Sequence, residues 1–298
     1  MLLCVDVGNT QISLGLYATD AEEPGSDRLE IVRPPLVRHW RMRTDPRMTA
    51  DELRVAFAGM LGDYAKKVTG IAALSTVPLL LRELRLLLDQ LRSEVLSVLV
   101  EPRVRTGVPV LVDNPKEVGS DRVVNTLAAF RLFGTACVVV DFGTSTNIDV
   151  VSPRGELLGA AIAPGVEISA EALASRAAAL TTVELARPRS AIGKNTVEGL
   201  QAGILFGFAG QVDGLVRRIQ VEMETEYKVD PASVTVLATG GLAPVIVSES
   251  ETITEHVPDL TLLGLRLVYL RTMSRSARAS KTARPGLRPG GAVAAESE

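Results

Sequence analysis

The chain has 298 residues, of which 46% are hydrophobic and 4% aromatic, and its formal net charge is −3. This length and apolar content suffice for a full core and for two domains of ordinary size. The mild negative charge argues against nucleic-acid binding as the main function, and no apolar run approaches the length of a membrane span, so we expect a cytoplasmic protein.

The first predicted unit is a strand, a short polar turn and a second strand. Residues 2–7 form an apolar run that carries Asp6, residues 8–11 form the turn, and residues 12–17 alternate as a strand. A Walker loop or a Rossmann glycine loop leads from a strand into a helix, so neither motif fits. An acid, a glycine and hydroxyl side chains at a strand tip are typical of a phosphate site with its counter-cation.

Strands and helices alternate through the rest of the first half. The capping-box sequence Thr49-Ala50-Asp51-Glu52 precedes an apolar helical face. Strands are expected over 37–42, 68–74 and 95–100, and a leucine-rich helix over 79–92. This alternation predicts an α/β layer fold.

A polar cluster, Gly119-Ser120-Asp121-Arg122, precedes a predicted helix over 123–133. An acid in the first turn of a helix is stabilised by the helix dipole alone, so a purely structural role is one interpretation. A glycine two residues before an adjacent acid and cation also offers a base and an anion-binding group together. We favour the functional interpretation.

The hairpin over 138–151 repeats the first unit. Apolar residues 138–140 lead into Asp141-Phe142-Gly143-Thr144, the same order as Asp6-Val7-Gly8-Asn9-Thr10. A supersecondary unit that recurs about half a chain length away predicts two domains of like topology facing each other across a cleft.

The second half continues with a strand over 155–163, a helix over 167–179 and a long helix over 197–227. Five glycines in the long helix each cost about 1 kcal/mol relative to alanine. We therefore expect close packing there, against either a dimer partner or the cleft. These glycines are at positions 199, 203, 207, 210 and 214.

A short strand over 234–238 ends in Thr239-Gly240-Gly241-Leu242-Ala243. Paired glycines make a simple turn, and they also let a flat ligand such as adenosine approach the backbone. The last helix is expected from Pro258 to about residue 273. Residues 274–298 have no periodicity and are predicted to be a disordered tail.

The cysteines and histidines favour neither a disulfide nor a zinc site. Cys4 and Cys137 each lie in an apolar run, as buried reduced thiols of a cytosolic protein do. His39 and His256 are far apart in the sequence and have no cysteine or aspartate cluster near them.

Six motifs in this order make the chain resemble the type III pantothenate kinases over about residues 1 to 273. They are Asp-x-Gly-Asn-Thr, Gly-x-Asp-Arg, Asp-x-Gly-Thr, Ile-x-Pro-Gly, Gly-Lys-Asn-Thr and Thr-Gly-Gly-Leu-Ala. The resemblance implies an α/β fold of the acetate and sugar kinase/actin superfamily, with two ribonuclease H-like domains whose mixed sheets are flanked by helices and a nucleotide cleft between them. The expected domains are 1–115 and 116–273, with the last helix, about 261–273, packed back on the first, followed by the tail at 274–298.

The implied reaction is the ATP-dependent phosphorylation of pantothenate to 4'-phosphopantothenate, the first step of coenzyme A biosynthesis. The resemblance also implies a homodimer that needs Mg²⁺ and a monovalent cation, K⁺ or NH₄⁺. No nucleic-acid or membrane partner is expected.

The resemblance also assigns roles residue by residue. Asp121 is the expected general base, Asp141 binds the monovalent cation and Thr144 binds the nucleotide. One carboxylate suffices to accept the hydroxyl proton, and phosphoryl transfer otherwise needs positioning and charge neutralisation. ATP phosphates are expected at Asp6, Val7, Gly8, Asn9, Thr10, Gln11, Ile12 and Ser13, and pantothenate at Gly119, Ser120, Asp121, Arg122 and Thr196.

The chain departs from the family pattern at Val112, where many members carry a tyrosine that contacts substrate. Two alternatives to the pantothenate kinase are another small-molecule kinase of the superfamily and a non-catalytic regulatory relative. Such a regulator has no need of Asp121 or Asp141, and both are present. We therefore rank the enzyme first.

Overall fold

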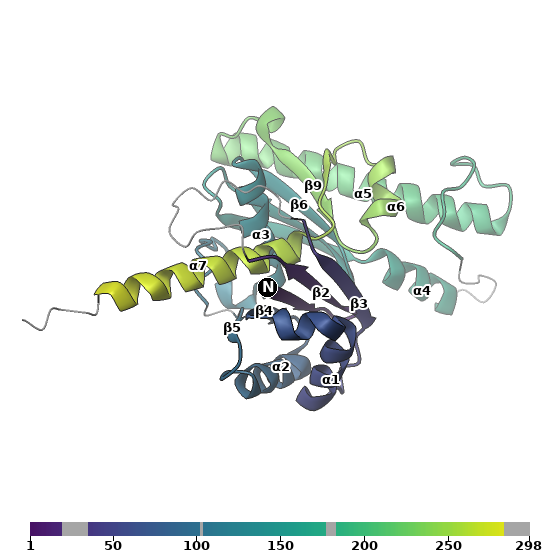
Figure 1. Cartoon of the computed structure of the whole chain (residues 1–298). Coiled ribbons are helices and arrows are strands. Elements are labelled where there is room, and N and C mark those ends of the chain that lie inside the picture. The colour runs from purple at the N-terminus through teal and green to yellow at the C-terminus, as the bar shows by residue number, and fades with distance from the viewer. Residues whose placement is uncertain (20–34, 102–103, 177–182, 283–298) are drawn as a thin grey trace, which may run out of the picture.

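The computed structural model describes residues 1–19, 35–101, 104–176 and 183–282 (Figure 1). Its strands are β1 (Leu2–Val7), β2 (Gln11–Tyr17), β3 (Arg38–Arg43), β4 (Gly70–Ser75), β5 (Leu96–Leu99), β6 (Cys137–Phe142), β7 (Ser145–Val151), β8 (Leu157–Pro164), β9 (Thr235–Thr239) and β10 (Glu255–His256). Over the described residues they form two five-stranded sheets, ordered β3-β2-β1-β4-β5 and β10-β9-β6-β7-β8.

The two sheets share one topology. In each, three strands form an antiparallel meander, and the other two run parallel to its first strand. The repeat confirms the two domains of like topology predicted from the paired hairpins. It also agrees with the fold that the family resemblance implies, which is two ribonuclease H-like domains with mixed sheets flanked by helices. The division at residue 115 remains a prediction.

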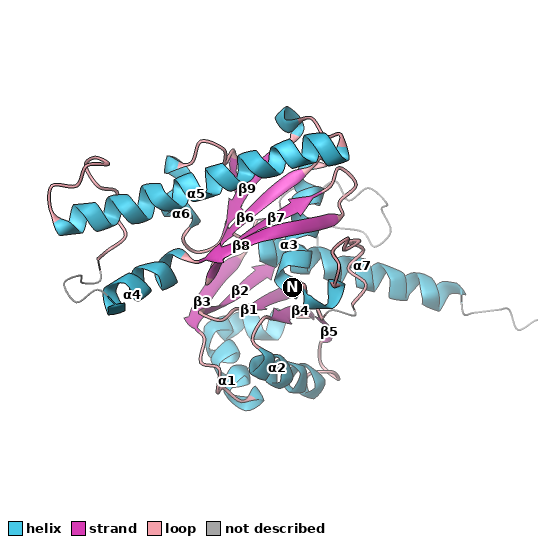
Figure 2. Cartoon of the chain, turned by 180° about the vertical axis from the view of Figure 1, so that it is seen from behind, coloured by secondary structure: helices cyan, strands magenta, loops and turns pink. Residues whose placement is uncertain are grey.

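Helices cover both sheets and fill the space between them. The α-helices are α1 (Ala50–Leu61), α2 (Pro78–Gln90), α3 (Ser120–Phe133), α4 (Val166–Arg176), α5 (Thr196–Tyr227), α6 (Ala243–Ile246) and α7 (Leu260–Thr282), and short 3₁₀ helices span Gly62–Lys67, Pro115–Glu117, Pro231–Ser233 and Val247–Glu249. α1 and α2 pack on the outer face of the first sheet, and α3 and α7 pack between the sheets. α5 and α6 cover the outer face of the second sheet, with the first residue of α4 packed beside them (Figure 2). None of the described helices is both long and apolar enough to cross a membrane.

Strand alternation sets the direction of the two predicted acids. Cys4 of β1 and Val139 of β6 lie in the core between the sheets, whereas the residues on either side of each lie in the outer cores. Successive side chains of a strand point to opposite faces. Asp6 and Asp141 therefore follow the inward series and point into the space between the sheets.

The first helix begins as predicted. Thr49 is its N-cap, and the capping box is complete, because the Glu52 N–H donates to Thr49 Oγ1 (3.3 Å) and the Thr49 N–H donates to Glu52 Oε2 (2.8 Å). Both exchanged bonds satisfy backbone donors that a helix start otherwise leaves free.

The last helix is longer than predicted. α7 continues past Met273 to Thr282, so the start of a disordered tail at Ser274 was placed too early. Residues 274–282 contain alanine, arginine and lysine and neither glycine nor proline, and such residues extend a helix without an apolar face. Residues 283–298 lie outside the described part of the chain.

The glycine face of α5 has open space for added side chains, although Gly193 packs on the backbone at its start: a Cβ on Gly193 would stand 2.6 Å from the Cα of Gly199. A Cβ placed on any of its five glycines meets no atom within 4 Å. The opposite side of the helix buries Leu205, Val212 and Val216 in the outer core of the second sheet. Within the described chain, close packing of the expected kind is therefore found where Gly193 meets Gly199, and a side chain added at any of the five glycines would enter open space. The five are Gly199, Gly203, Gly207, Gly210 and Gly214.

Candidate active site

The two predicted phosphate turns meet across the gap between the sheets. Gly8 N–H donates to the carbonyl oxygen three residues on (3.0 Å), and Gly143 N–H donates to the one two residues on (3.1 Å). At the tips, Thr10 Oγ1 and Thr144 Oγ1 share a hydrogen bond of 2.9 Å. The tips of the two turns, one from each domain, are therefore in direct contact.

A cavity of about 420 Å³ opens beside these turns. Its walls come from β1, β2, β3 and the β6–β7 turn, with the starts of α3 and α7 and the turn after β9. The predicted residues that line it are Asp6, Gly8, Asn9, Thr10, Gln11, Ser13, Asp121, Asp141 and Thr144.

Three of these residues form a crowded carboxylate cluster. Burial, together with repulsion from Asp121 and Asp141, raises the pKa of Asp6 to about 8. Burial, with repulsion from Asp121 and then Asp149, raises the pKa of Asp141 to about 7. Without an added positive charge, the cluster therefore retains protons near neutral pH.

Asp121 lies in the first turn of α3, with Gly119 as the N-cap. Burial raises the pKa of Asp121, whereas a hydrogen bond from the Arg122 N–H and the Arg122 charge lower it. A Cβ on Gly119 would stand 2.3 Å from Asp121 Oδ1, so any larger residue there would make the carboxylate move from this position. That oxygen is buried without a hydrogen-bond partner in the described chain.

Arg122 is not one of the residues that line the cavity, and it pairs with Asp149 of β7. Nε and Nη2 lie 2.7 and 2.6 Å from the same oxygen, Asp149 Oδ1, and the two side chains are 15% and 0% exposed. Burial raises the pKa of Asp149 to about 6, although the arginine charge opposes this. Sequence reasoning gave Asp149 no role; the available signal was an acid among the three apolar residues that end β7, Ile148, Val150 and Val151.

Asp141 is held from two sides. The Asn125 amide donates to Asp141 Oδ2 (3.5 Å) and accepts a hydrogen bond from the Thr261 hydroxyl (2.9 Å), which joins α3 and α7 to the carboxylate. On the other side, Gly240 has φ +92°, and a Cβ there would stand 2.6 Å from Asp141 Oδ1. Gly240 therefore makes room for this acid, and both Gly240 and Gly241 line the cavity.

The carboxylate oxygens of the cavity fit a hard cation such as Mg²⁺ whose other ligands come from the phosphates of a nucleotide. Mg²⁺ takes oxygen ligands, often one or two carboxylates plus substrate phosphates and water. Among the described residues, no three acidic, histidine or cysteine side chains converge on one point as a complete metal site. Asp6 and Asp141 can each contribute a carboxylate while a nucleotide supplies the remaining ligands.

Several predicted residues do not line the cavity. Val7 and Ile12 pair with each other, and their side chains are buried in the core beneath α1 and α2, so only their backbone can approach a ligand. Gly119, Ser120 and Arg122 adjoin Asp121 at the start of α3 without being cavity walls. Thr196, the first residue of α5, is exposed and outside the cavity.

The cavity also has walls that sequence reasoning missed. His39 and Arg41 of β3 line it together with Asp259 and Glu167. His39 Nδ1 lies 3.3 Å from Asp259 Oδ1. Alternation places His39 and Arg41 on one face of the edge strand, but only the packed structure shows that this face looks into the cavity.

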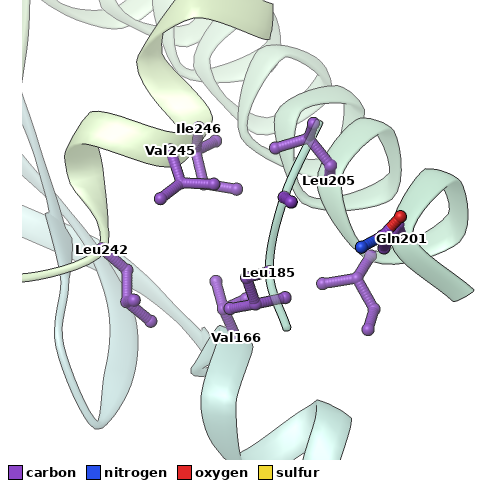
Figure 3. A pocket seen from close by; sticks show the side chains of 9 residues that line it. Val166, Leu185, Gln201, Leu205, Leu242, Val245 and Ile246 are labelled. Carbon is purple, nitrogen blue, oxygen red and sulfur yellow. The ribbon is translucent and has the colours of Figure 1, made fainter. Parts of the chain in front are cut away.

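A separate apolar crevice behind Leu242 is too small for a substrate. Its volume is about 10 Å³, and its walls include Val166 of α4, Leu205 of α5 and Ile246 of α6 (Figure 3). Such a space holds at most about one water.

Comparison with known proteins agrees with this geometry. The family model described as type III pantothenate kinase matches residues 2–218. A type III pantothenate kinase of Saccharopolyspora erythraea is 66% identical over 91% of this chain and 98% of its own length. One from Rhodococcus jostii is 58% identical over 92% and 97%. Among solved structures, a conserved protein of the Baf family of transcriptional activators from Campylobacter jejuni covers 91% of this chain and 98% of its own, with a TM-score of 0.51 and 14% identity, a likeness of fold alone.

Proposed function

Because the chain belongs to the type III pantothenate kinase family, we infer that it is a phosphotransferase with an alcohol acceptor that phosphorylates pantothenate with ATP. This is the first step of coenzyme A synthesis. The observation that carries the proposal is the convergence of Asp121 with Asp6 and Asp141 at two paired phosphate turns on one cavity.

The chain's own groups account for most of the reaction. Glycine turns at Gly8 and Gly143 let the triphosphate approach the backbone, and the Thr10 and Thr144 hydroxyls exchange their mutual bond for bonds to phosphate. Asp121 accepts the proton of the pantothenate hydroxyl as the hydroxyl oxygen attacks the γ-phosphorus. The bond between the γ-phosphorus and the oxygen that bridges it to the β-phosphate breaks, and ADP leaves. Enclosure between the two sheets strengthens each of these contacts.

Cations complete the proposed site. When bound, Mg²⁺ and a monovalent cation, K⁺ or NH₄⁺, neutralise phosphate charge in the transition state. Asp141 is the proposed ligand of the monovalent cation, with Asp6 facing the phosphates. The raised pKa values of both acids support a site that takes positive charge.

A homodimer completes the proposed pantothenate site. Thr196 lies outside the cavity of its own chain, and α4 and the adjoining end of α5 project beyond the two sheets (Figure 2). A second copy packed on the glycine face of α5 would bring its own Thr196 toward this cavity. A cytoplasmic location belongs to the same proposal and agrees with the buried free thiols of Cys4 and Cys137.

One experiment tests the function. Purified protein is incubated with ATP, MgCl₂, KCl and pantothenate, and phosphopantothenate is measured by mass spectrometry. We expect turnover in the parent, its loss in Asp121→Asn, and normal turnover in Asp113→Asn, whose acid is exposed in the preceding loop. No product from the parent would refute the kinase, and full activity of Asp121→Asn would refute the base.

A further inference from the structure

The charge of the cavity walls is one-sided. Five carboxylates and a single guanidinium, that of Arg41, line it among the described residues. Both proposed substrates are anions. The one arginine among these acids is therefore the wall residue best suited to bind a negatively charged group. The five acids are Asp6, Asp121, Asp141, Glu167 and Asp259.

Arg41 lies in a cross-strand row with the phosphate turn. Asp6 of β1 pairs with Ser13 of β2, and Ser13 pairs with Arg41 of β3. Directly opposed residues of antiparallel strands share a face, and all three line the cavity. Neighbouring strands lie about 4.8 Å apart, which puts the Cα of Arg41 roughly 10 Å from that of Asp6.

The guanidinium is available to a ligand. Arg41 is exposed to the solvent of the cavity. Within the described part of the chain, no carboxylate lies within ion-pair distance of it, although Asp259 lies beside the neighbouring His39. The other arginine of the site, Arg122, is already bound to Asp149.

We propose that Arg41 binds the non-transferred phosphates of ATP, the ADP part of the nucleotide. This rests on the proposed function. Asp121, next to Asp6, marks the acceptor end, and transfer in line puts the leaving phosphate on the far side of the γ-phosphorus. The row from Asp6 through Ser13 to Arg41 leads away from the base and follows the nucleotide toward ADP.

The chemistry of arginine suits this role. Its planar fork donates two parallel hydrogen bonds to phosphate oxygens and stays charged at all working pH values. The cavity has five acids, and the Arg41 guanidinium supplies a positive charge to balance the phosphates. We place it on the ADP side of the nucleotide, away from the carboxylate cluster. It holds ADP in place while the γ-phosphate moves.

Calorimetric titration with ADP and MgCl₂ tests the assignment without turnover. We expect Arg41→Met to bind ADP roughly ten- to hundred-fold more weakly than the parent, the usual effect of losing charge-assisted hydrogen bonds. Arg41→Lys should recover part of the affinity. The control is Arg38→Met, on the same strand, exposed and outside the cavity, and it should match the parent.

Two measurements keep the proposal open to refutation. Thermal unfolding should be unchanged in Arg41→Met, because the side chain has no ion pair to lose among the residues that the structure describes. An unchanged ADP affinity in Arg41→Met would overturn the proposal, as would a raised KM for pantothenate with ADP binding intact, which would assign Arg41 to the acceptor. Absence of turnover in the parent would instead refute the proposed function, while the ADP titration would still decide the role of Arg41.

Discussion

At the scale of single residues, Asp6 is expected to lower the stability of the ligand-free protein while it serves the proposed reaction. Its folded pKa of about 8 is raised from an ordinary 3.8. A carboxyl with a raised folded pKa stabilises the fold below its unfolded value and loses that contribution as pH rises through its folded value. Asp6 therefore weakens the ligand-free fold progressively between about pH 4 and pH 8.

We predict that Asp6→Asn raises the unfolding temperature of the ligand-free protein at pH 8 and leaves it nearly unchanged at pH 4. Scanning fluorimetry in buffers without K⁺ and Mg²⁺ measures this. The same variant should lose turnover. Asp113→Asn, at an exposed acid, is the control and should show no pH-dependent gain; equal midpoints for Asp6→Asn and the parent at pH 8 would contradict the prediction.

Asp149 is predicted to stabilise through its pairing with Arg122. Removing one partner of a buried pair leaves an uncompensated charge, so Asp149→Ala should cost about 3 to 5 kcal/mol in urea unfolding. The double variant Arg122→Met with Asp149→Leu replaces both charges by apolar groups and should recover most of that loss. A double variant as unstable as the single one would show that the pair itself is not responsible.

At the scale of elements, the position of the β6–β7 turn depends on its contact with Gly165, the residue that follows β8. A Cβ on Gly165, just after β8, would stand 2.3 Å from the Thr144 carbonyl oxygen. Gly165→Ala must therefore displace the turn that carries Thr144. A displacement near 1 Å at a reacting site costs on the order of a hundred-fold in rate.

We predict such a loss in kcat/KM for ATP, with the fold intact by circular dichroism. The matched control is Gly159→Ala in β8, where a Cβ meets no atom within 4 Å. Parent-like kinetics in Gly165→Ala would show that the turn tolerates the shift. That result would contradict the proposed role of Thr144 in binding the nucleotide.

At the scale of the whole molecule, the proposed dimer predicts complementation between two inactive variants. If Thr196 acts on the partner's site, a mixed dimer of Asp121→Asn and Thr196→Ala chains has one site in which both residues are intact. Activity should return when the two are co-expressed, and the mass in solution should be twice that of one chain. A monomer that turns over at full rate would refute the dimer.

A variant on the glycine face of α5 checks the proposed interface. Gly207 is exposed and open in the described chain, so Gly207→Arg should be neutral for the fold of one chain. Its bulk should nevertheless separate the dimer, which size-exclusion chromatography with light scattering detects. An unchanged dimer would place the interface elsewhere.

Local sequence patterns are enough to define the local geometry of this chain. Period-two alternation put Asp6 and Asp141 on the face of each strand opposite to Val5 and Val140, and the repeated hairpin predicted two domains of one topology. The Thr49 capping box marked where α1 begins. These features depend on neighbours only a few residues away, so pattern alone is enough to define them.

Only the tertiary structure decided which faces meet. It joined Thr10 to Thr144, paired Arg122 with Asp149, and turned Arg41 into the cavity, each across a long stretch of chain. Whether a charged side chain faces solvent, a partner or a substrate depends on how separate elements pack, and local periodicity carries no information about that. The same reason explains why the length of α7 and the empty side of the α5 glycines became visible only in the folded chain.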